Sequence, residues 1–185
     1  MASTGQVVVN AATGERVVFQ TLARDSAGEL LRLDVFFAPG SGAKAMHVHP
    51  HQEERFEILD GSLRFRVGRE TKVVRAGDVI VVPAGPPHLP SNVGETEAHC
   101  VAEFRPALNI ETFFENAFAL LSARGPRTSL PMILELAELL SHYRREVQAT
   151  PAPMRVRRDY PSASSKWRGW CWPAVPTRRS ARSST

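Results

Sequence analysis

Histidine and glutamate side chains concentrate in residues 47–61, which read His-Val-His-Pro-His-Gln-Glu-Glu-Arg-Phe-Glu-Ile-Leu-Asp-Gly. If the start of this segment is extended, His47 and His49 project from the same face of one strand. A short bend after them can return the Glu54 carboxylate to the same place from the adjoining strand. The segment therefore predicts a local chelate for one metal ion.

A second segment, residues 77–92, supplies one further histidine, His88. It follows Pro-Ala-Gly-Pro-Pro, whose prolines fix φ and whose glycine tolerates positive φ, so a rigid turn can hold the His88 ring on the opposite side of the ion. Three imidazole nitrogens and one carboxylate oxygen suit a divalent transition ion such as iron, manganese, nickel, copper or zinc. We predict one such ion as the cofactor, with coordination positions left open for water, oxygen or substrate.

The two segments resemble the two sequence motifs of the cupins. The first motif is matched by His47-x-His49-x4-Glu54-x6-Gly61 and the second by Gly77-x5-Pro83-x-Gly85-x2-His88-x3-Asn92. The first segment departs from the family motif only at the glycine expected before the first histidine, which is displaced by one residue. The resemblance covers residues 28–106 and implies a mainly β fold, an antiparallel β-barrel of the jelly-roll type with the metal inside.

Each histidine also has a simpler interpretation. The four predicted ligands could form a polar cluster without metal, as in cupins that have lost the ion. His51 falls in the bend, and we predict that it lies behind the ligands or faces solvent, with a role in orienting or replacing one of them as the alternative. Alternation from Glu54 points Glu53 away from the site. We expect His99 to be an ordinary strand residue.

Length and composition favour one compact domain with an extension, since the chain has 185 residues, of which 43% are apolar. It contains no run of about eighteen apolar residues and no basic leader, so we expect neither export nor a membrane span. The two cysteines, Cys100 and Cys171, are far apart and lack metal-binding spacing. We therefore expect no disulfide framework and a cytoplasmic location.

Short apolar and β-branched runs separated by turn residues predict the strands of an all-β domain over residues 1–108. Apart from the metal-binding segments, the predicted strands are residues 6–10, 15–22, 29–37, 62–67, 70–75, 79–82 and 97–105. If Glu54 points inward, alternation places a set of apolar side chains in the interior as well. These predicted pocket residues are Phe56, Ile58, Leu63, Phe65 and Val67. Since alternation places no arginine or lysine inside, a strongly anionic substrate lacks a clamp.

Apolar residues recur at helical spacing in residues 109–149, which predicts two amphipathic helices after the barrel. The first has Asn109 as N-cap, ends at Gly125–Pro126, and carries Ile110, Phe113, Phe114, Ala117, Phe118 and Leu121. The second starts near Pro131, runs to about Gln148, and carries Ile133, Leu136, Ala137, Leu140 and Val147. We expect both helices to cover the barrel, with a lid or a dimerisation arm as alternatives. The resemblance also implies a homodimer.

The last residues, 150–185, differ in charge from the rest of the chain. They contain eight Lys or Arg against one acid, whereas residues 1–149 contain fifteen against eighteen. The Pro, Ser, Arg and Trp of this tail show no periodicity, which predicts disorder. Interleaved arginine and tryptophan could bind single-stranded nucleic acid. We do not expect such a partner. A sensor that regulates transcription is disfavoured as well, because the barrel region is not basic and no helix-turn-helix pattern flanks it. A shifted reading frame or a recent extension without function is an alternative origin for the tail.

The resemblance implies several activities, because a fold does not determine a function. The ion and the apolar pocket favour a metal-dependent enzyme similar to the flavonol and diketone dioxygenases, acting on a small enolic or aromatic molecule. In this interpretation Glu54 is the catalytic residue, which binds the ion and accepts a substrate proton. A cupin isomerase or decarboxylase and a non-catalytic binding or sensor module remain alternatives.

Overall fold

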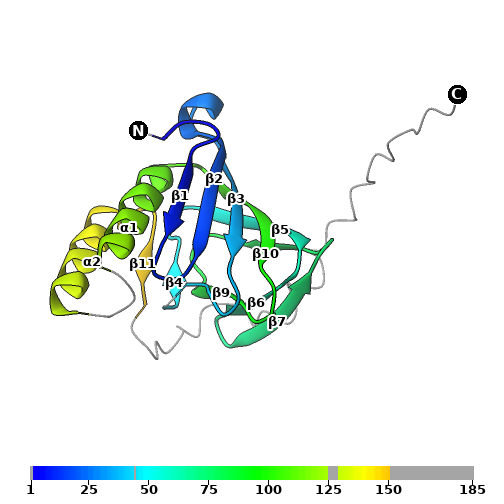
Figure 1. Ribbon diagram of the computed structural model, residues 1–185. Coiled ribbons are helices and arrows are strands. Elements are labelled where there is room, and N and C mark those ends of the chain that lie inside the picture. Colours follow the sequence, from blue (N-terminus) through cyan, green and yellow to red (C-terminus); the bar gives the residue numbers. More distant parts are fainter. Residues whose placement is uncertain (1, 44, 125–128, 151–185) are drawn as a thin grey trace, which may run out of the picture.

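Two antiparallel β-sheets and two helices make up the computed structural model, which describes residues 2–43, 45–124 and 129–150 (Figure 1). The larger sheet has the order β1-β2-β3-β10-β5-β8 and the smaller one β11-β4-β9-β6-β7. The strands of the larger sheet are β1 (Val7–Asn10), β2 (Glu15–Thr21), β3 (Leu31–Phe37), β10 (Ala98–Arg105), β5 (Glu53–Asp60) and β8 (Val79–Val82). Those of the smaller sheet are β11 (Gln148–Ala149), β4 (His47–Val48), β9 (His88–Asn92), β6 (Ser62–Val67) and β7 (Glu70–Arg75).

This architecture confirms the predicted mainly β fold. The runs predicted as strands are strands in the structure, with ends that differ by a residue or two. Burial alternates along β5, where Glu54, Phe56 and Ile58 are buried while the residues between them are not. On β6, Leu63 and Phe65 are buried and the arginines between and beyond them are exposed. A period of two is what a strand with one face on a core requires.

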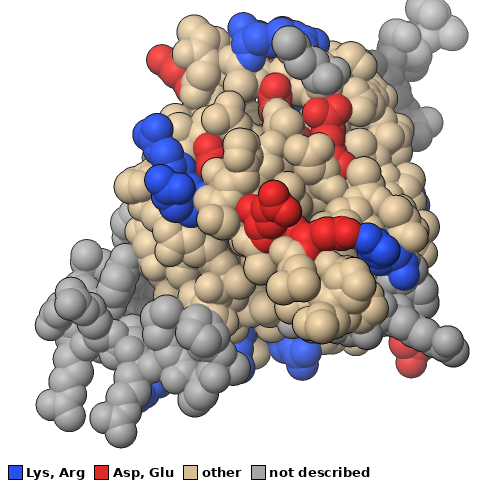
Figure 2. All heavy atoms as spheres, turned by 90° about the vertical axis from the view of Figure 1, so that its left-hand side faces the viewer, with Lys and Arg blue, Asp and Glu red and all other residues tan. Residues whose placement is uncertain are grey.

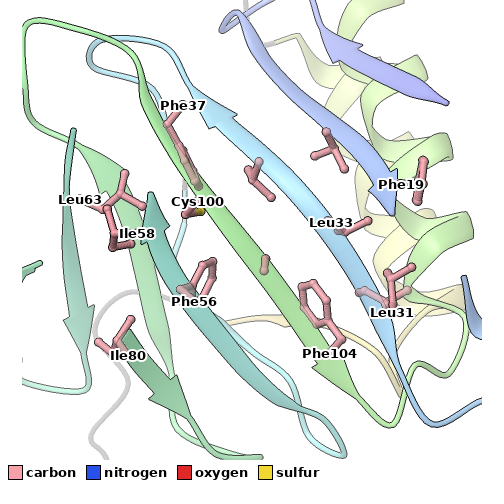
Figure 3. Packing of buried hydrophobic residues seen from close by; sticks show 14 of the residues in the cluster. Phe19, Leu31, Leu33, Phe37, Phe56, Ile58, Leu63, Ile80, Cys100 and Phe104 are labelled. Atoms are coloured by element: carbon pink, nitrogen blue, oxygen red, sulfur yellow. The ribbon is translucent and has the colours of Figure 1, made fainter. Parts of the chain in front are cut away.

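An apolar core lies between the sheets and contains most of the predicted pocket residues (Figure 3). Phe56 and Phe65 pack edge to face across it, with ring centroids 4.8 Å apart. Leu63, Phe65 and Ile58 are at most 1% exposed, and Val67 packs against this core from a half-buried position. All five side chains therefore contribute to the packed interior, while their role in binding a substrate stays a prediction.

Gly61 closes the turn between β5 and β6, and its position explains why the first motif ends in glycine. Its φ is 73°, a left-handed conformation that side chains with a Cβ disfavour. A Cβ at this position would also lie 2.9 Å from the Cα of Ala98. Both the turn and the close approach of β10 exclude larger residues here.

Helix α1 (Ile110–Arg124) covers one edge of the larger sheet, beside β1 (Figure 1). Ile110 and Ala117 are buried, and Phe113, Phe114 and Phe118 pack half-buried against the core. The Ser122 hydroxyl donates to the Val9 carbonyl oxygen at 2.9 Å, which fastens the helix to β1. The first helix thus begins where it was predicted and packs on the barrel as expected.

Helix α2 (Leu130–His142) is shorter than predicted, and only part of its predicted apolar stripe is buried. It begins after Ser129, whose hydroxyl accepts from the Met132 N–H. Met132 is buried, whereas Ile133 and Ala137 of the predicted stripe are exposed. The prediction that this helix continues to Gln148 is wrong.

The helix ends early because the residues after His142 are buried elsewhere. The Tyr143 ring packs on Phe113 at 5.7 Å between centroids, and Val147 is 4% exposed. Gln148 and Ala149 then pair with Val48 and His47 as strand β11. No glycine or proline in the sequence marks the end of this helix, so contacts with distant residues determine where it ends.

Other expectations concern the surface and the ends of the chain. In the view of the helical side in Figure 2, residues other than Lys, Arg, Asp and Glu make up most of the described surface. Leu130, Ile133 and Leu134 of α2 are among the exposed apolar residues. Within residues 2–43, 45–124 and 129–150, no helix is long and apolar enough to cross a membrane. The predicted disordered tail, apart from Thr150, and Cys171 lie outside the described residues.

Candidate metal centre

Four side chains from three strands and one adjoining loop meet between the two sheets: His47, His49, Glu54 and His88. Each of the four residues offers one potential ligand atom, and these atoms all lie within 4.8 Å of one another. Glu54, His49 and His88 are at most 5% exposed, and His47 is half-buried. The four residues predicted as metal ligands are therefore close enough to share one ion.

The structure distributes the four ligand residues over the two sheets differently from the prediction. Glu54 does not come from the strand adjoining His47, because β5 belongs to the larger sheet and β4 to the smaller one. His88 is not held in a turn on the opposite side. It begins β9, the direct neighbour of β4, where His47 and His88 are paired. The bend after His49 therefore carries the chain from the smaller sheet to the larger one instead of closing a hairpin.

In all three histidines, the Nδ1 atom forms a hydrogen bond with a backbone carbonyl oxygen. His47 Nδ1 donates to Ala45 at 3.3 Å, and His88 Nδ1 donates to Pro86 at 3.1 Å. His49 Nδ1 donates to the carbonyl oxygen of Glu146 at 2.6 Å. Because a carbonyl oxygen can only accept, each neutral ring carries its proton on Nδ1 and offers the Nε2 lone pair to a metal.

The Glu54 carboxylate lies beside two of these Nε2 atoms. Its Oε2 is 2.8 Å from His88 Nε2 and 3.7 Å from His49 Nε2. The Phe104 ring packs on the His49 ring, with centroids 5.3 Å apart, and limits the site on the apolar side. The cluster is thus a buried polar group whose members are held by specific partners.

Burial and mutual contacts shift the pKa values of the cluster. Burial, with repulsion from His88 and His49, lowers the pKa of His47 from 6.5 to about 3, and burial also lowers that of His49. Burial opposes the charged form of Glu54 too, but the hydrogen bond from His88 and the nearby histidines lower its pKa overall. For His88, burial lowers the pKa, while the bond to Glu54 outweighs it and raises the pKa. Two neutral imidazoles and an ion pair result.

This donor set fits a divalent transition ion. Two rings are neutral with Nε2 free, the carboxylate is ionised, and His88 would need to lose one proton to bind. His47, His49, Glu54 and His88 would hold the ion. Nitrogen-rich sets with one carboxylate suit iron, manganese, nickel, copper or zinc over calcium or magnesium.

Two neighbours of the cluster show where sequence reasoning was incomplete. His51 lies in the bend and is exposed, which favours the solvent-facing alternative over a place behind the ligands. Gln52, which the sequence did not single out, is fully buried and donates through Nε2 to Pro106 and Ala107 carbonyl oxygens at 3.0 and 2.9 Å. A buried glutamine in a short bend carries no sequence signal, since the residue type is usually exposed.

The remaining strand histidine lies elsewhere. His99 is on β10, where its Nε2 bonds to Asp34 Oδ1 at 2.9 Å and its ring stacks on Phe36 at 4.2 Å between centroids. This agrees with the expectation of an ordinary strand residue.

Comparison with known proteins identifies the class. Residues 33–103 match the family described as the cupin domain, which spans both histidine segments. The described strands also align with a solved protein from Thermotoga maritima, described as a predicted oxalate decarboxylase, with a TM-score of 0.50. That alignment covers 56% of this chain and 92% of the other at 21% identity, and it supports the fold alone. The chain thus contains a cupin domain at residues 33–103.

Among characterised relatives, the chain is similar to plant proteins of the germin type. It is 38% identical over 78 residues to oxalate oxidase 1 of Hordeum vulgare, covering 38% of each protein. It is 42% identical over 78 residues to germin-like protein 3-5 of Oryza sativa subsp. japonica, covering 38% of this chain and 34% of the relative. The chain thus spans little more than a third of these relatives' length.

Proposed function

We propose that this cupin binds one divalent transition ion through His47, His49, Glu54 and His88 and acts as a metal-dependent oxidoreductase of the dioxygenase type. The observation that carries the proposal is the common orientation of the three rings, whose Nδ1 atoms all donate to backbone carbonyl oxygens. This common orientation suits metal binding, because it leaves Nε2 as the ring nitrogen available to an ion, and in His49 and His88 that atom lies beside the Glu54 carboxylate. When bound, the ion would supply Lewis acidity and, for iron, manganese or copper, a redox couple.

The protein's own groups would bind and orient a small substrate. Glu54 contacts His88 and lies near His49, so its carboxylate could accept a proton from an enol or acid as well as hold the ion. The apolar side chains beyond it, Phe56 and Ile58, would exclude water from the reacting molecule. Because lysine and arginine are absent from the buried described residues, the substrate's charge would have to be balanced at the cluster itself.

A small organic molecule with two adjacent oxygens meets these requirements. Enolic and aromatic compounds would also use the apolar surroundings, which is why we favour them. Similarity to oxalate oxidase 1 supports oxalate as a second candidate, since oxalate too presents an oxygen pair. An isomerase, a decarboxylase and a non-catalytic sensor would use the same cluster. Cytoplasmic location and a homodimer remain part of the proposal.

Metal content and oxygen uptake together test the proposal. We would measure metals by inductively coupled plasma mass spectrometry in the wild type, in a His49→Ala/Glu54→Gln double variant, and in a His99→Ala control. We expect near-stoichiometric metal in the wild type and the control and none in the double variant. Oxygen uptake would then be followed with a 1,3-diketone, a flavonol and oxalate.

Each outcome has a distinct meaning. Metal with oxygen uptake supports the dioxygenase or oxidase function, and the substrate consumed identifies its class. Metal with substrate turnover but no oxygen uptake would replace the proposal with an isomerase or decarboxylase. Little metal even after reconstitution would overturn the metal-dependent function and favour a binding module.

A further inference from the structure

The carbonyl oxygen that holds His49 comes from a distant part of the chain. The Ala45 and Pro86 carbonyls lie two residues before the histidines that they hold, within the two cupin segments. Glu146, in contrast, is 97 residues from His49 and follows helix α2. One of the three ring orientations therefore depends on the C-terminal extension.

We call residues 143–150 the C-terminal strap. Its far end is fastened beside the cluster, where β11 pairs with β4 and both the N–H and the hydroxyl of Thr150 donate to the Met46 carbonyl oxygen at 2.9 and 3.0 Å. Its near end is held by Tyr143, whose hydroxyl accepts from Asn116 Nδ2 at 2.9 Å. The strap is thus anchored on both sides of Glu146.

Glu146 itself is 4% exposed and makes two different contacts. Its carbonyl oxygen accepts from His49, and its carboxylate accepts from the Asn109 N–H at 3.3 Å, just before α1 begins. Val147 follows it, and the Val147 N–H donates to the Tyr143 carbonyl oxygen at 2.9 Å. This turn sets the direction in which the Glu146 carbonyl points.

We propose that the C-terminal strap is a positioning element of the metal centre, in which the Glu146 carbonyl holds His49 in the Nδ1–H tautomer with Nε2 directed at the ion. The inference rests on the proposed function for the ion, but the hydrogen bond exists without it. Partners behind a metal-binding histidine typically contribute about 10- to 100-fold in metal affinity. The helical extension therefore does more than cover the barrel, because it delivers this partner.

A proline in the strap tests the inference in the full-length chain. Val147→Pro removes the N–H that bonds to Tyr143 and disfavours a helical turn at Glu146, so the Glu146 carbonyl is redirected. Val147→Ala is the matched control, since it loses buried volume and keeps the backbone bond. A second pair is Thr150→Pro, which removes both bonds to Met46, and Thr150→Val, which removes only the hydroxyl bond.

Two readouts separate positioning from general destabilisation. The first is the side-chain 15N spectrum of His49 in metal-free protein, which reports the tautomer. The second is the affinity for zinc measured by competition with a chelating dye. We expect the wild type and both controls to show a protonated Nδ1, and both proline variants to show mixed tautomers and about 10- to 100-fold weaker zinc binding. Thermal unfolding shows whether each variant is folded.

The outcomes are distinguishable from those that test the proposed function. A wild-type His49 protonated on Nε2 would overturn the strap's role, as would folded proline variants with wild-type spectra and zinc affinity. If a proline variant does not fold, the wild-type tautomer and the other pair still decide. If the wild type binds no zinc while its His49 tautomer is as expected, the metal proposal fails and the positioning contact stands.

Discussion

The interior face of β5 has a polar end and an apolar end. Both ends are buried, but they are stabilised in different ways. Glu54 at one end is 5% exposed, and Phe56 and Ile58 further along are 2% and 1% exposed. The apolar side chains need only neighbours of suitable volume, because the hydrophobic effect is not directional. The buried carboxylate needs a partner at a defined distance, and His88 supplies it at 2.8 Å.

The polar and the apolar end therefore differ in the substitutions that they can tolerate. A packed apolar region can be altered in volume at a cost in stability while its chemistry remains unchanged. A polar cluster loses its chemistry when one member is removed, even if the fold survives. The following changes are designed to break or sharpen this contrast.

Removal of a histidine from the polar end has the largest expected effect. His88→Ala deletes one nitrogen ligand and the hydrogen bond to Glu54, so we expect the protein to lose its stoichiometric metal. The affinity should fall by more than the roughly 100-fold that bounds the effect of partners behind a ligand. Dye competition measures it. Unchanged metal content in His88→Ala would mean that the ion binds elsewhere.

Truncation at the apolar end should affect stability and leave metal binding intact. Ile58→Ala creates a cavity in the core, for which we expect a loss of about 2–5 kcal/mol in the free energy of unfolding. Its neighbour Leu59 is 45% exposed, so Leu59→Ala is a matched control with a change within about 0.5 kcal/mol. Urea unfolding measures both. Loss of metal from folded Ile58→Ala would show that the two ends are coupled.

Acid should weaken the metal-free protein through His47. Burial lowers the pKa of His47 from 6.5 to about 3, so between these values the unfolded chain binds a proton that the folded protein does not. Stability is therefore lost as the pH falls below 6.5. His47→Gln lacks this group, and its unfolding free energy should fall less steeply with acid in urea titrations. Parallel curves for the two proteins would contradict the lowered pKa of His47.

Substitution of His51 should have the smallest effect. This residue is exposed and lies outside the cluster. We expect His51→Ala to change stability by at most about 0.5 kcal/mol and to leave zinc affinity near that of the wild type. A loss of about 10-fold or more would restore the prediction that His51 lies behind the ligands.

Much of the barrel could be predicted from the sequence, because strand burial follows a local period of two. Alternation along residues 54–58 and 63–67 correctly separated interior from exterior side chains. The spacing of His47, His49, Glu54 and His88 likewise predicted a cluster that the fold brings together within 4.8 Å. Residue type and motif spacing carry this information, although the first segment supplies its ligands from both sheets.

The sequence by itself determined which side chains could bind an ion and which residues form the strands. Only the tertiary structure decided that Glu54 faces the histidines from the other sheet, that α2 ends at His142, and that the Glu146 carbonyl reaches His49. These features depend on contacts between residues far apart in the chain. A backbone carbonyl is present at every residue, so its use as a partner leaves no mark in the sequence.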